Sequence, residues 1–315
     1  MKKSLASAFL LFIALYSYSQ QDPQFSQNMF NHAAINPGAA GSGDRICAYA
    51  LIREQWMGFE GNPSTKVFNI NAPLTQLEAI PSAVGLTIIT DNIGFEKNLE
   101  LNLTYAYLVK IGRGKLGIGL NLGFFNKALV NVDWNGYDPN NDPITSDPLV
   151  PNDESALALD FAGGAYYRTE KFYLGLSSTH LNQPTLDLNK TKIFLTRHYY
   201  FTTGYNVQLP NPLFQLIPST FIQYDGIISQ MNFNINLLYD NKFWGGASYR
   251  LGDAYTAMVG MELVNGIKFG VAYDFLTTDI GTYSSGSFEA IIGYCFQVSR
   301  EPGKTKGNWI LNWKH

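Results

Sequence analysis

Residues 288 to 296 read Phe-Glu-Ala-Ile-Ile-Gly-Tyr-Cys-Phe. Because successive side chains of a strand point to opposite faces, one face of this stretch carries Phe288, Ala290, Ile292, Tyr294 and Phe296. The opposite face carries Glu289, Gly293 and Cys295. An apolar, aromatic face combined with a face that accepts charge and glycine is typical of a sheet that closes around a polar lumen and is surrounded by lipid.

Segments with the same alternation recur along almost the whole chain. They predict an all-β protein, a single transmembrane antiparallel β-barrel of about fourteen strands that closes between its first and last strand. The expected strands are residues 44–56, 64–74, 82–92, 98–111, 115–126, 157–168, 171–182, 198–209, 214–225, 228–240, 243–251, 254–264, 267–277 and 286–297.

The polar faces of these strands distinguish a barrel from a soluble sandwich. The strand at 228–240 has an inner face that carries Asn232, Asn234 and Asn236. A sandwich would have to bury these amides in an apolar core, which is costly. Clear outward sets are Leu99, Leu101, Leu103, Tyr105 and Tyr107 in one strand, and Ile267, Phe269, Val271, Tyr273 and Phe275 in another.

The lengths of the connections test the strand count. If both ends of the barrel chain face the periplasm, connections alternate between the two sides of the membrane, and the long loops are expected outside. The three longest connections, at 131–156, 183–197 and 278–285, all fall in the outer set. The inner set contains short turns such as 112–114. A miscount of one strand would have mixed the two sets, so the asymmetry favours an even number.

The first residues have the composition of a secretion signal. Met1-Lys2-Lys3 is basic, an apolar run extends from about Leu5 to Tyr16, and Ser17-Tyr18-Ser19 offers small residues to signal peptidase. A membrane anchor is the alternative, but the apolar run is too short and polar residues follow it. We expect a cleaved signal peptide at 1–19 with cleavage near Gln20, a periplasmic N-terminal segment at 20–43, the barrel at 44–298 and a periplasmic tail at 299–315.

The charge balance excludes one class of partner. Loss of residues 1–19 removes two of 22 basic residues and none of 25 acidic residues, so the net charge changes from −3 to −5. A nucleic-acid-binding protein would present a basic stripe, and we expect no nucleic-acid partner. After the signal, no stretch reaches the roughly 18 consecutive apolar residues that a membrane helix needs.

Enzymatic motifs are weak. Gly112-Arg113-Gly114-Lys115-Leu116-Gly117 matches a dinucleotide fingerprint, but that motif requires a helix after it, and a strand follows here. Ser177, Ser178 and His180 form the one cluster suggestive of a hydrolase. By strand parity, Ser177 and His180 face opposite sides, whereas Ser178 and His180 share a face without an acidic partner. We expect no enzyme, no catalytic residues and no cofactor.

Metal sites are not predicted either. His32, His180, His198 and His315 lack a ligand-like spacing, and two cysteines cannot build a structural zinc site. The loop from Asn131 to Ala156 is rich in aspartate but does not follow the pattern of an EF-hand loop. A solvated outer loop is the preferred interpretation, with weak calcium binding as the alternative.

The two cysteines are expected to lie close together. Cys47 lies near the start of the first strand and Cys295 near the end of the last, and these strands are neighbours in a closed barrel. Both side chains are expected to point inward, as is Arg53. They would therefore meet at the seam, where an oxidising periplasm permits a disulfide. Two unpaired cysteines are the alternative, because Cα atoms more than about 7 Å apart cannot be bridged.

The C-terminal tail ends in the apolar stretch Trp309-Ile310-Leu311-Asn312-Trp313. Exposed apolar groups of this size usually mark an interaction site. We expect Trp309 and Trp313 to dock on a partner or to fold back under the barrel. The alternative is an aromatic anchor at the membrane interface.

The start of the mature chain resembles the PorP/SprF family of outer-membrane proteins. The resemblance begins with Gln21-Asp22-Pro23-Gln24-Phe25-Ser26-Gln27-Asn28-Met29-Phe30 and Ile35-Asn36-Pro37-Gly38-Ala39-Ala40-Gly41. It continues with Arg53, Gln55, Trp56, Gly58 and Phe59, which are similar to the first hairpin of that family. One departure is that Gly38-Ala39-Ala40 is small throughout, where the family tends to have an aromatic residue.

The resemblance implies a role in type IX secretion, in which folded cargo crosses the outer membrane. It implies a non-enzymatic barrel that supports export or surface anchoring of cargo such as adhesins, including those of gliding motility. Its implied partners are outer-membrane lipid, the periplasmic and lipoprotein ring components of the secretion system, and the secreted cargo. A passive porin or small-solute transporter is the alternative. Inward-facing Tyr49, Leu108, Tyr166 and Phe221 favour a filled or constricted lumen over an open one.

Overall fold

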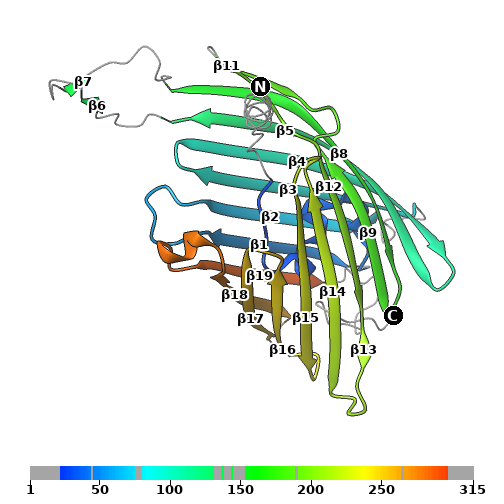
Figure 1. Ribbon diagram of the computed structural model, residues 1–315. Coiled ribbons are helices and arrows are strands. Elements are labelled where there is room, and N and C mark those ends of the chain that lie inside the picture. The colour runs from blue at the N-terminus through cyan, green and yellow to red at the C-terminus, as the bar shows by residue number, and fades with distance from the viewer. Residues whose placement is uncertain are drawn as a thin grey trace, which may run out of the picture.

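The computed structural model describes residues 22–43, 45–74, 80–130, 136–137, 143–144, 153–188, 191–263 and 266–296. Within these residues, fourteen antiparallel strands form a closed ring (Figure 1). The ring confirms the predicted all-β barrel and its strand number. The expected signal peptide at 1–19 and the tail at 299–315, with Trp309 and Trp313, lie outside the described residues.

The barrel strands follow the predicted segments closely. Their bounds are β1 Ile46–Glu54, β2 Ser64–Pro73, β3 Ser82–Ile93, β4 Glu96–Ile111, β5 Gly114–Leu129, β8 Glu154–Arg168, β9 Phe172–Thr179, β12 His198–Tyr205, β14 Phe214–Tyr224, β15 Ser229–Tyr239, β16 Phe243–Arg250, β17 Ala254–Glu262, β18 Ile267–Leu276 and β19 Ser287–Phe296. Each pairs with its neighbours in the chain order of this list, and β19 returns to pair with β1.

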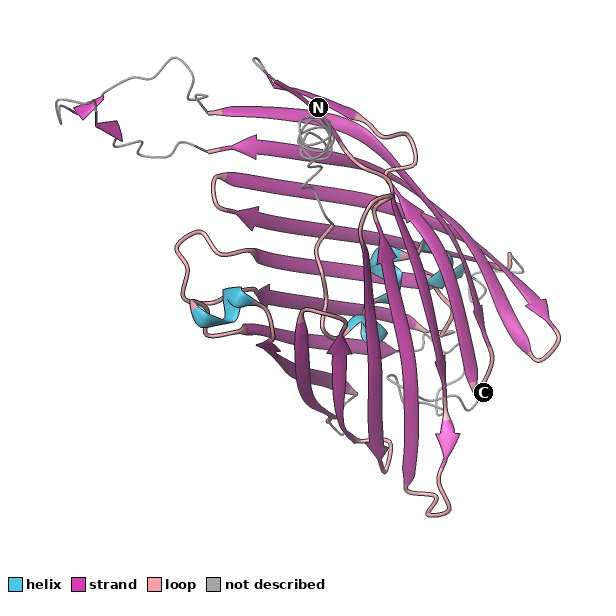
Figure 2. Ribbon diagram, viewed as in Figure 1, coloured by secondary structure: helices cyan, strands magenta, loops and turns pink. Residues whose placement is uncertain are grey.

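Short elements complete the fold. The remaining strands are β6 Gly136–Tyr137, β7 Pro143–Ile144, β10 Thr185–Leu188, β11 Thr191–Phe194 and β13 Val207–Gln208. The helices are η1 Asn28–Phe30, α2 His32–Ile35, η2 Pro37–Ala39 and η4 Asp279–Thr282 (Figure 2). None of the helices in the described ranges is long and apolar enough to cross a membrane.

The two faces of the wall differ as the alternation predicts. Leu120 and Leu122 in β5 are 65% and 49% exposed, whereas Asn121 between them is 3% exposed. The same contrast recurs around the ring, with Ile235, Val259, Phe269 and Ile292 exposed and Asn234, Asn236 and Glu289 buried. A continuous apolar belt outside and polar side chains inside are what a lipid-embedded barrel requires.

The connections separate into two sets. One end of the barrel, called the long-loop end here, carries the connections 130–153, 180–197 and 277–286. The opposite end, called the short-turn end, carries shorter ones, including Gly112-Arg113, where Gly112 has a positive φ of 59°. Strand β5 follows directly, so this glycine-rich stretch is a hairpin turn and lacks the helix that a dinucleotide site requires.

The seam between β1 and β19 brings the two cysteines together at the short-turn end. The register places Cys47 opposite Cys295, with Cα atoms 4.1 Å apart, and the structure joins them by a disulfide. Cys47 lies on the face of β1 that also carries buried Tyr49 and Arg53, so both cysteines are on the lumenal side, as strand parity predicts.

The first described segment corrects one expectation. Residues 22–43, called the plug segment here, were expected outside the barrel, but they lie inside the lumen. Its side chains contact inward residues on opposite sides of the ring, such as Tyr49 in β1, Asn234 in β15 and Thr179 in β9. Asp22 lies at the long-loop end beside Thr179, whereas Gly41 lies at the short-turn end against Ala83. The segment thus passes from one end of the lumen to the other.

Glycines in the wall make room for the plug segment near the short-turn end. A Cβ on Gly119 would lie 2.3 Å from the carbonyl carbon of Pro37, and a Cβ on Gly164 would lie 2.2 Å from Oδ1 of Asn36. Conversely, a Cβ on Gly38 would lie 2.6 Å from the carbonyl oxygen of Gly117. Backbone therefore packs directly on backbone here, which explains why position 38 is a glycine.

Candidate functional site: the plugged lumen

The lumen is filled where the plug segment passes through it. Phe25, Phe30 and Ile35 of the segment are at most 9% exposed and form one cluster with inward residues of the wall. Among these wall residues are Tyr49, Tyr166 and Phe221, each 4% exposed. Leu108 is 6% exposed and packs in a second cluster with Ala40 of the plug segment. Inward side chains of an open pore would be in contact with water, so their burial favours the filled lumen that they predicted.

A first polar cluster holds Ser26. The Arg53 guanidinium lies between two carboxylates, at 2.7 Å from Oδ2 of Asp274 and 3.4 Å from Oε2 of Glu289. The Ser26 hydroxyl donates to Asp274 at 2.6 Å, and the Ser26 main-chain N–H donates to Glu289 at 2.7 Å. Arg250 adds a second cation at 3.3 Å from Asp274.

This arrangement, called the Ser26 cluster here, pairs buried charges of opposite sign. Its two guanidinium groups face two carboxylates, and each of these four side chains is at most 2% exposed. Removal of one member of a buried ion pair leaves an uncompensated charge, which is strongly destabilising. The cluster therefore fixes the plug segment to β1, β16, β18 and β19 at one position.

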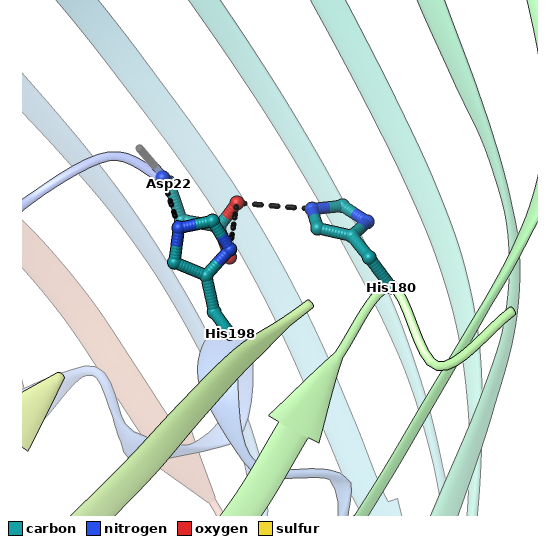
Figure 3. Close-up of side chains that lie close together, drawn as sticks. All are labelled: Asp22, His180 and His198. Atoms are coloured by element: carbon teal, nitrogen blue, oxygen red, sulfur yellow. Dashed lines mark hydrogen bonds and ion pairs between the residues drawn. The ribbon is translucent and has the colours of Figure 1, made fainter. Parts of the chain in front are cut away.

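A second polar cluster holds Asp22 at the long-loop end (Figure 3). The Nε2 atom of His180 lies 2.9 Å from Oδ1 of Asp22, and the Nδ1 atom of His198 lies 3.5 Å from the same oxygen. The other oxygen, Oδ2, accepts hydrogen bonds from Thr179 at 2.8 Å and from Tyr200 at 2.5 Å. We call Asp22, His180 and His198 the Asp22 cluster.

The charges of the Asp22 cluster support one another. His180 has a second carboxylate partner, because its Nδ1 atom lies 2.9 Å from Oδ2 of Asp160. Burial lowers the pKa of His180, but the Asp22 carboxylate and the hydrogen bonds to Asp160 and Asp22 outweigh burial and raise it well above its usual value. Burial raises the pKa of Asp22, but the neighbouring His198 and His180 rings and the hydrogen bonds from His180 and Tyr200 together lower it. The raised pKa favours a charged His180 ring between the side chains of Asp22 and Asp160.

The predicted Ser–His geometry is wrong in the structure. Strand β9 ends at Thr179, and His180 has a positive φ of 52°, which rotates its side chain into the lumen. Ser177 donates to the carbonyl of Ile35 in the plug segment, whereas Ser178 lies beside exposed Leu176 and donates to the carbonyl of Thr179. His180 does have acidic partners, Asp22 and Asp160, but they come from distant parts of the chain.

The family-motif residues lie at the end of β1 and at the start of the connection from β1 to β2. Arg53 points into the lumen and belongs to the Ser26 cluster. Trp56, with a positive φ of 54°, donates its main-chain N–H to Ser287, and Gln55 donates its N–H to Pro63. Gly58 has a φ of 108° and lies near Tyr283, while Phe59 is 39% exposed. The motif thus joins the two sides of the seam at the long-loop end.

Several site residues were not identified from the sequence. Asp22, Ser26 and His198 gain their roles only when the plug segment enters the lumen, and Asp160 gains its role only when β8 lies beside His180. Asp274 of the Ser26 cluster could have been identified from the sequence. It lies between the outward residues of β18, so it faces inward, at the same end of the barrel as Arg53 and Glu289. The acidic loop considered for calcium lies mostly outside the described residues.

Comparisons with solved structures find other barrels. The chain is similar to the outer membrane protein Omp33 of Acinetobacter baumannii, with a TM-score of 0.46 and 8% identity over 80% of this chain and 98% of that one. It is also similar to the toluene transporters TbuX of Ralstonia pickettii, at 0.47 and 12% over 85% and 93%, and TodX of P. putida, at 0.48 and 10% over 86% and 95%. At these values the likeness carries no inference about function. Among curated proteins, none matches the chain.

A closed ring of strands, an apolar belt and a polar lumen define an outer-membrane β-barrel protein. A model of the family described as type IX secretion system membrane protein PorP/SprF matches residues 17–294. Because this match spans most of the chain, the protein belongs to the PorP/SprF family. It is thus an outer-membrane component of type IX secretion.

Proposed function

We propose that the protein is a closed, non-enzymatic barrel that supports export or surface anchoring of cargo proteins such as adhesins, including adhesins used in gliding. The observation that carries the proposal is the filled lumen. A barrel whose interior is occupied by its own chain is not suited to be a permanently open channel. It can instead bind partner proteins at its two ends and through its loops.

The two ends of the barrel suggest different partners. With the usual orientation of outer-membrane barrels, the long-loop end faces outward and the short-turn end faces the periplasm. Cargo would then meet the long loops, and the periplasmic and lipoprotein ring components would meet the short-turn end. In this orientation Asp22 is at the outer end of the lumen, so the mature N-terminal segment would not lie wholly in the periplasm as expected from the sequence.

The C-terminal tail is proposed as a further contact with the ring. Trp309 and Trp313 would follow β19, which ends at the short-turn end. A variant that lacks residues 304–315 should insert normally but lose ring components during purification. Normal recovery of these components and normal secretion would count against docking by the tail and would favour an aromatic membrane anchor.

The principal test is affinity purification of the protein from outer membranes followed by mass spectrometry. We expect secretion-system ring components and a large surface protein to be recovered. An unrelated barrel from the same membranes, purified in parallel, controls for proteins that share the membrane only. Recovery of the barrel alone after mild cross-linking would contradict the proposal.

A passive porin is the second candidate function, because the strand alternation fits it equally well. The inward aromatic side chains of Tyr49, Tyr166 and Phe221 are buried, which argues against an open porin channel. Small-solute uptake in liposome swelling assays separates the two functions. Rapid uptake at the rate of a general porin would favour the second candidate.

A further inference from the structure

The Asp22 cluster combines the ligand types and distances of a transition-metal site. Its members offer two imidazole nitrogens and one carboxylate oxygen, and the ligand atoms all lie within 4.8 Å of one another. The distances from Oδ1 of Asp22 to the two rings, 2.9 Å and 3.5 Å, bracket the separation of about 3.4 Å between neighbouring ligands that bonds of about 2.1 Å make around a tetrahedral ion.

The surroundings of the cluster orient these ligands as in known metal sites. Metal-binding histidines usually donate their second ring nitrogen to a carboxylate or a main-chain carbonyl. The Nδ1 atom of His180 faces Asp160 in this way, at 2.9 Å. Thr179 and Tyr200 both donate to Oδ2 of Asp22, which leaves Oδ1 directed at the two histidines. His180 and His198 are each 2% exposed, so few competing water molecules reach the rings.

His198 is the ligand that would have to adjust. Its Nδ1 atom lies 2.9 Å from the carbonyl of Thr196, and its Nε2 atom faces the main-chain N–H of Asp22 at 3.3 Å. Coordination through Nδ1 moves the ring proton to Nε2, so the 2.9 Å contact with Thr196 and the 3.3 Å contact with the Asp22 N–H both have to lengthen. The ring of His198 therefore has to turn away from the carbonyl of Thr196 when the ion binds.

We propose that Asp22, His180 and His198 bind one divalent transition-metal ion of the zinc type. Two imidazoles favour zinc and its neighbours over calcium or magnesium, which prefer oxygen ligands alone. The ion replaces the proton between Nε2 of His180 and Oδ1 of Asp22 and also binds Nδ1 of His198, which leaves its fourth position free. Because Asp22 belongs to the plug segment, His180 directly follows β9 and His198 begins β12, the bound ion fastens the plug segment to the wall. This inference does not depend on the role in secretion.

Zinc binding to the tag-free mature protein in detergent tests the proposal directly. After treatment with a chelator and dialysis, isothermal titration calorimetry with Zn²⁺ should show one site, and Ca²⁺ should not compete at equal concentration. His180→Gln and His198→Gln should each weaken binding at least tenfold. Asp160→Asn, which changes only the group that orients His180, should weaken it about 10- to 100-fold.

His32→Gln is the matched control. His32 is a plug-segment histidine that contacts Tyr166 and Thr202, away from the cluster, and its replacement should leave zinc affinity unchanged. Hydrogen exchange gives a second readout: zinc should slow exchange of the main-chain amides near Asp22, and a chelator should reverse the effect. Absence of zinc binding in the wild-type protein, or equal binding by all the histidine variants, would overturn the proposal.

Discussion

Replacement of Gly119 by alanine tests how the plug segment is seated. The new Cβ would lie 2.3 Å, 2.4 Å and 2.6 Å from main-chain atoms of Pro37 and Gly38, none of which belongs to a flexible side chain. Ordinary contacts begin at 3.4 Å, so η2 has to move away from β5 by about 1 Å. That movement strains the hydrogen bonds of Asn36 to the carbonyls of Ala165 and Leu176, which are 3.1 Å and 3.2 Å long.

The size of the effect follows from the cost of overpacking. An extra methyl in a closely packed interior usually costs about 1–3 kcal/mol. If this cost falls on the seated state, the population with an unseated plug segment rises by about 5- to 150-fold. Because amide exchange reports local opening, exchange at residues 34–41 should accelerate by the same factor in hydrogen-exchange mass spectrometry. Strands that do not touch the plug segment should be unaffected.

Gly245→Ala is the control for this experiment. Gly245 lies on the outer face of β16, and a Cβ there would have its nearest neighbour at 3.8 Å. This variant should exchange like the wild type. Equal exchange at residues 34–41 in Gly119→Ala and in the wild type would refute the close packing of the plug segment on β5.

Three further predictions concern the Ser26 cluster, the seam and the lipid face. Arg53→Met should destabilise the barrel by about 3–5 kcal/mol in urea unfolding, because it leaves Asp274 and Glu289 without this cation. Lys66→Met on the outer face is the control. Equal unfolding midpoints for the two variants would contradict the expected role of Arg53. Because Cys47 and Cys295 are bonded, the denatured wild-type protein should migrate faster in gel electrophoresis without reductant than with it. Cys47→Ser should migrate equally under both conditions. Two titratable thiols in the wild-type protein would exclude the bond. Leu122 lies on the exposed apolar face, so Leu122→Arg should lower the stability of the barrel in bilayers by about 2–4 kcal/mol. Leu122→Ile, the control, should leave the stability unchanged. Similar stability of the two variants would argue against lipid contact.

The wall of the barrel was predictable because its physics is local. Alternation with a period of two follows from the pleat, and one lipid face and one polar face label the parity of every strand. Parity and strand order together place Cys47 and Cys295 on the lumenal side of the closing pair, and the register of β1 and β19 sets them opposite each other. The lumenal placement follows from parity and strand order alone, whereas the exact register comes from the structure.

The plug segment was not predictable in the same way. It has no regular period, and its partners come from almost every part of the chain: Ser26 bonds to Glu289 across 263 residues, and Asp22 bonds to His180 across 158. Inward aromatics indicated that something fills the lumen but not which segment. His180 also escaped the parity rule, because its left-handed backbone ends the alternation of β9.

The central claim, that the protein's own N-terminal segment closes the lumen, is tested most directly by single-channel recording in planar lipid bilayers. The mature wild-type protein should insert without a steady open current, and Gly119→Ala should show more frequent brief openings. A large, stable conductance from the wild-type protein would contradict the account.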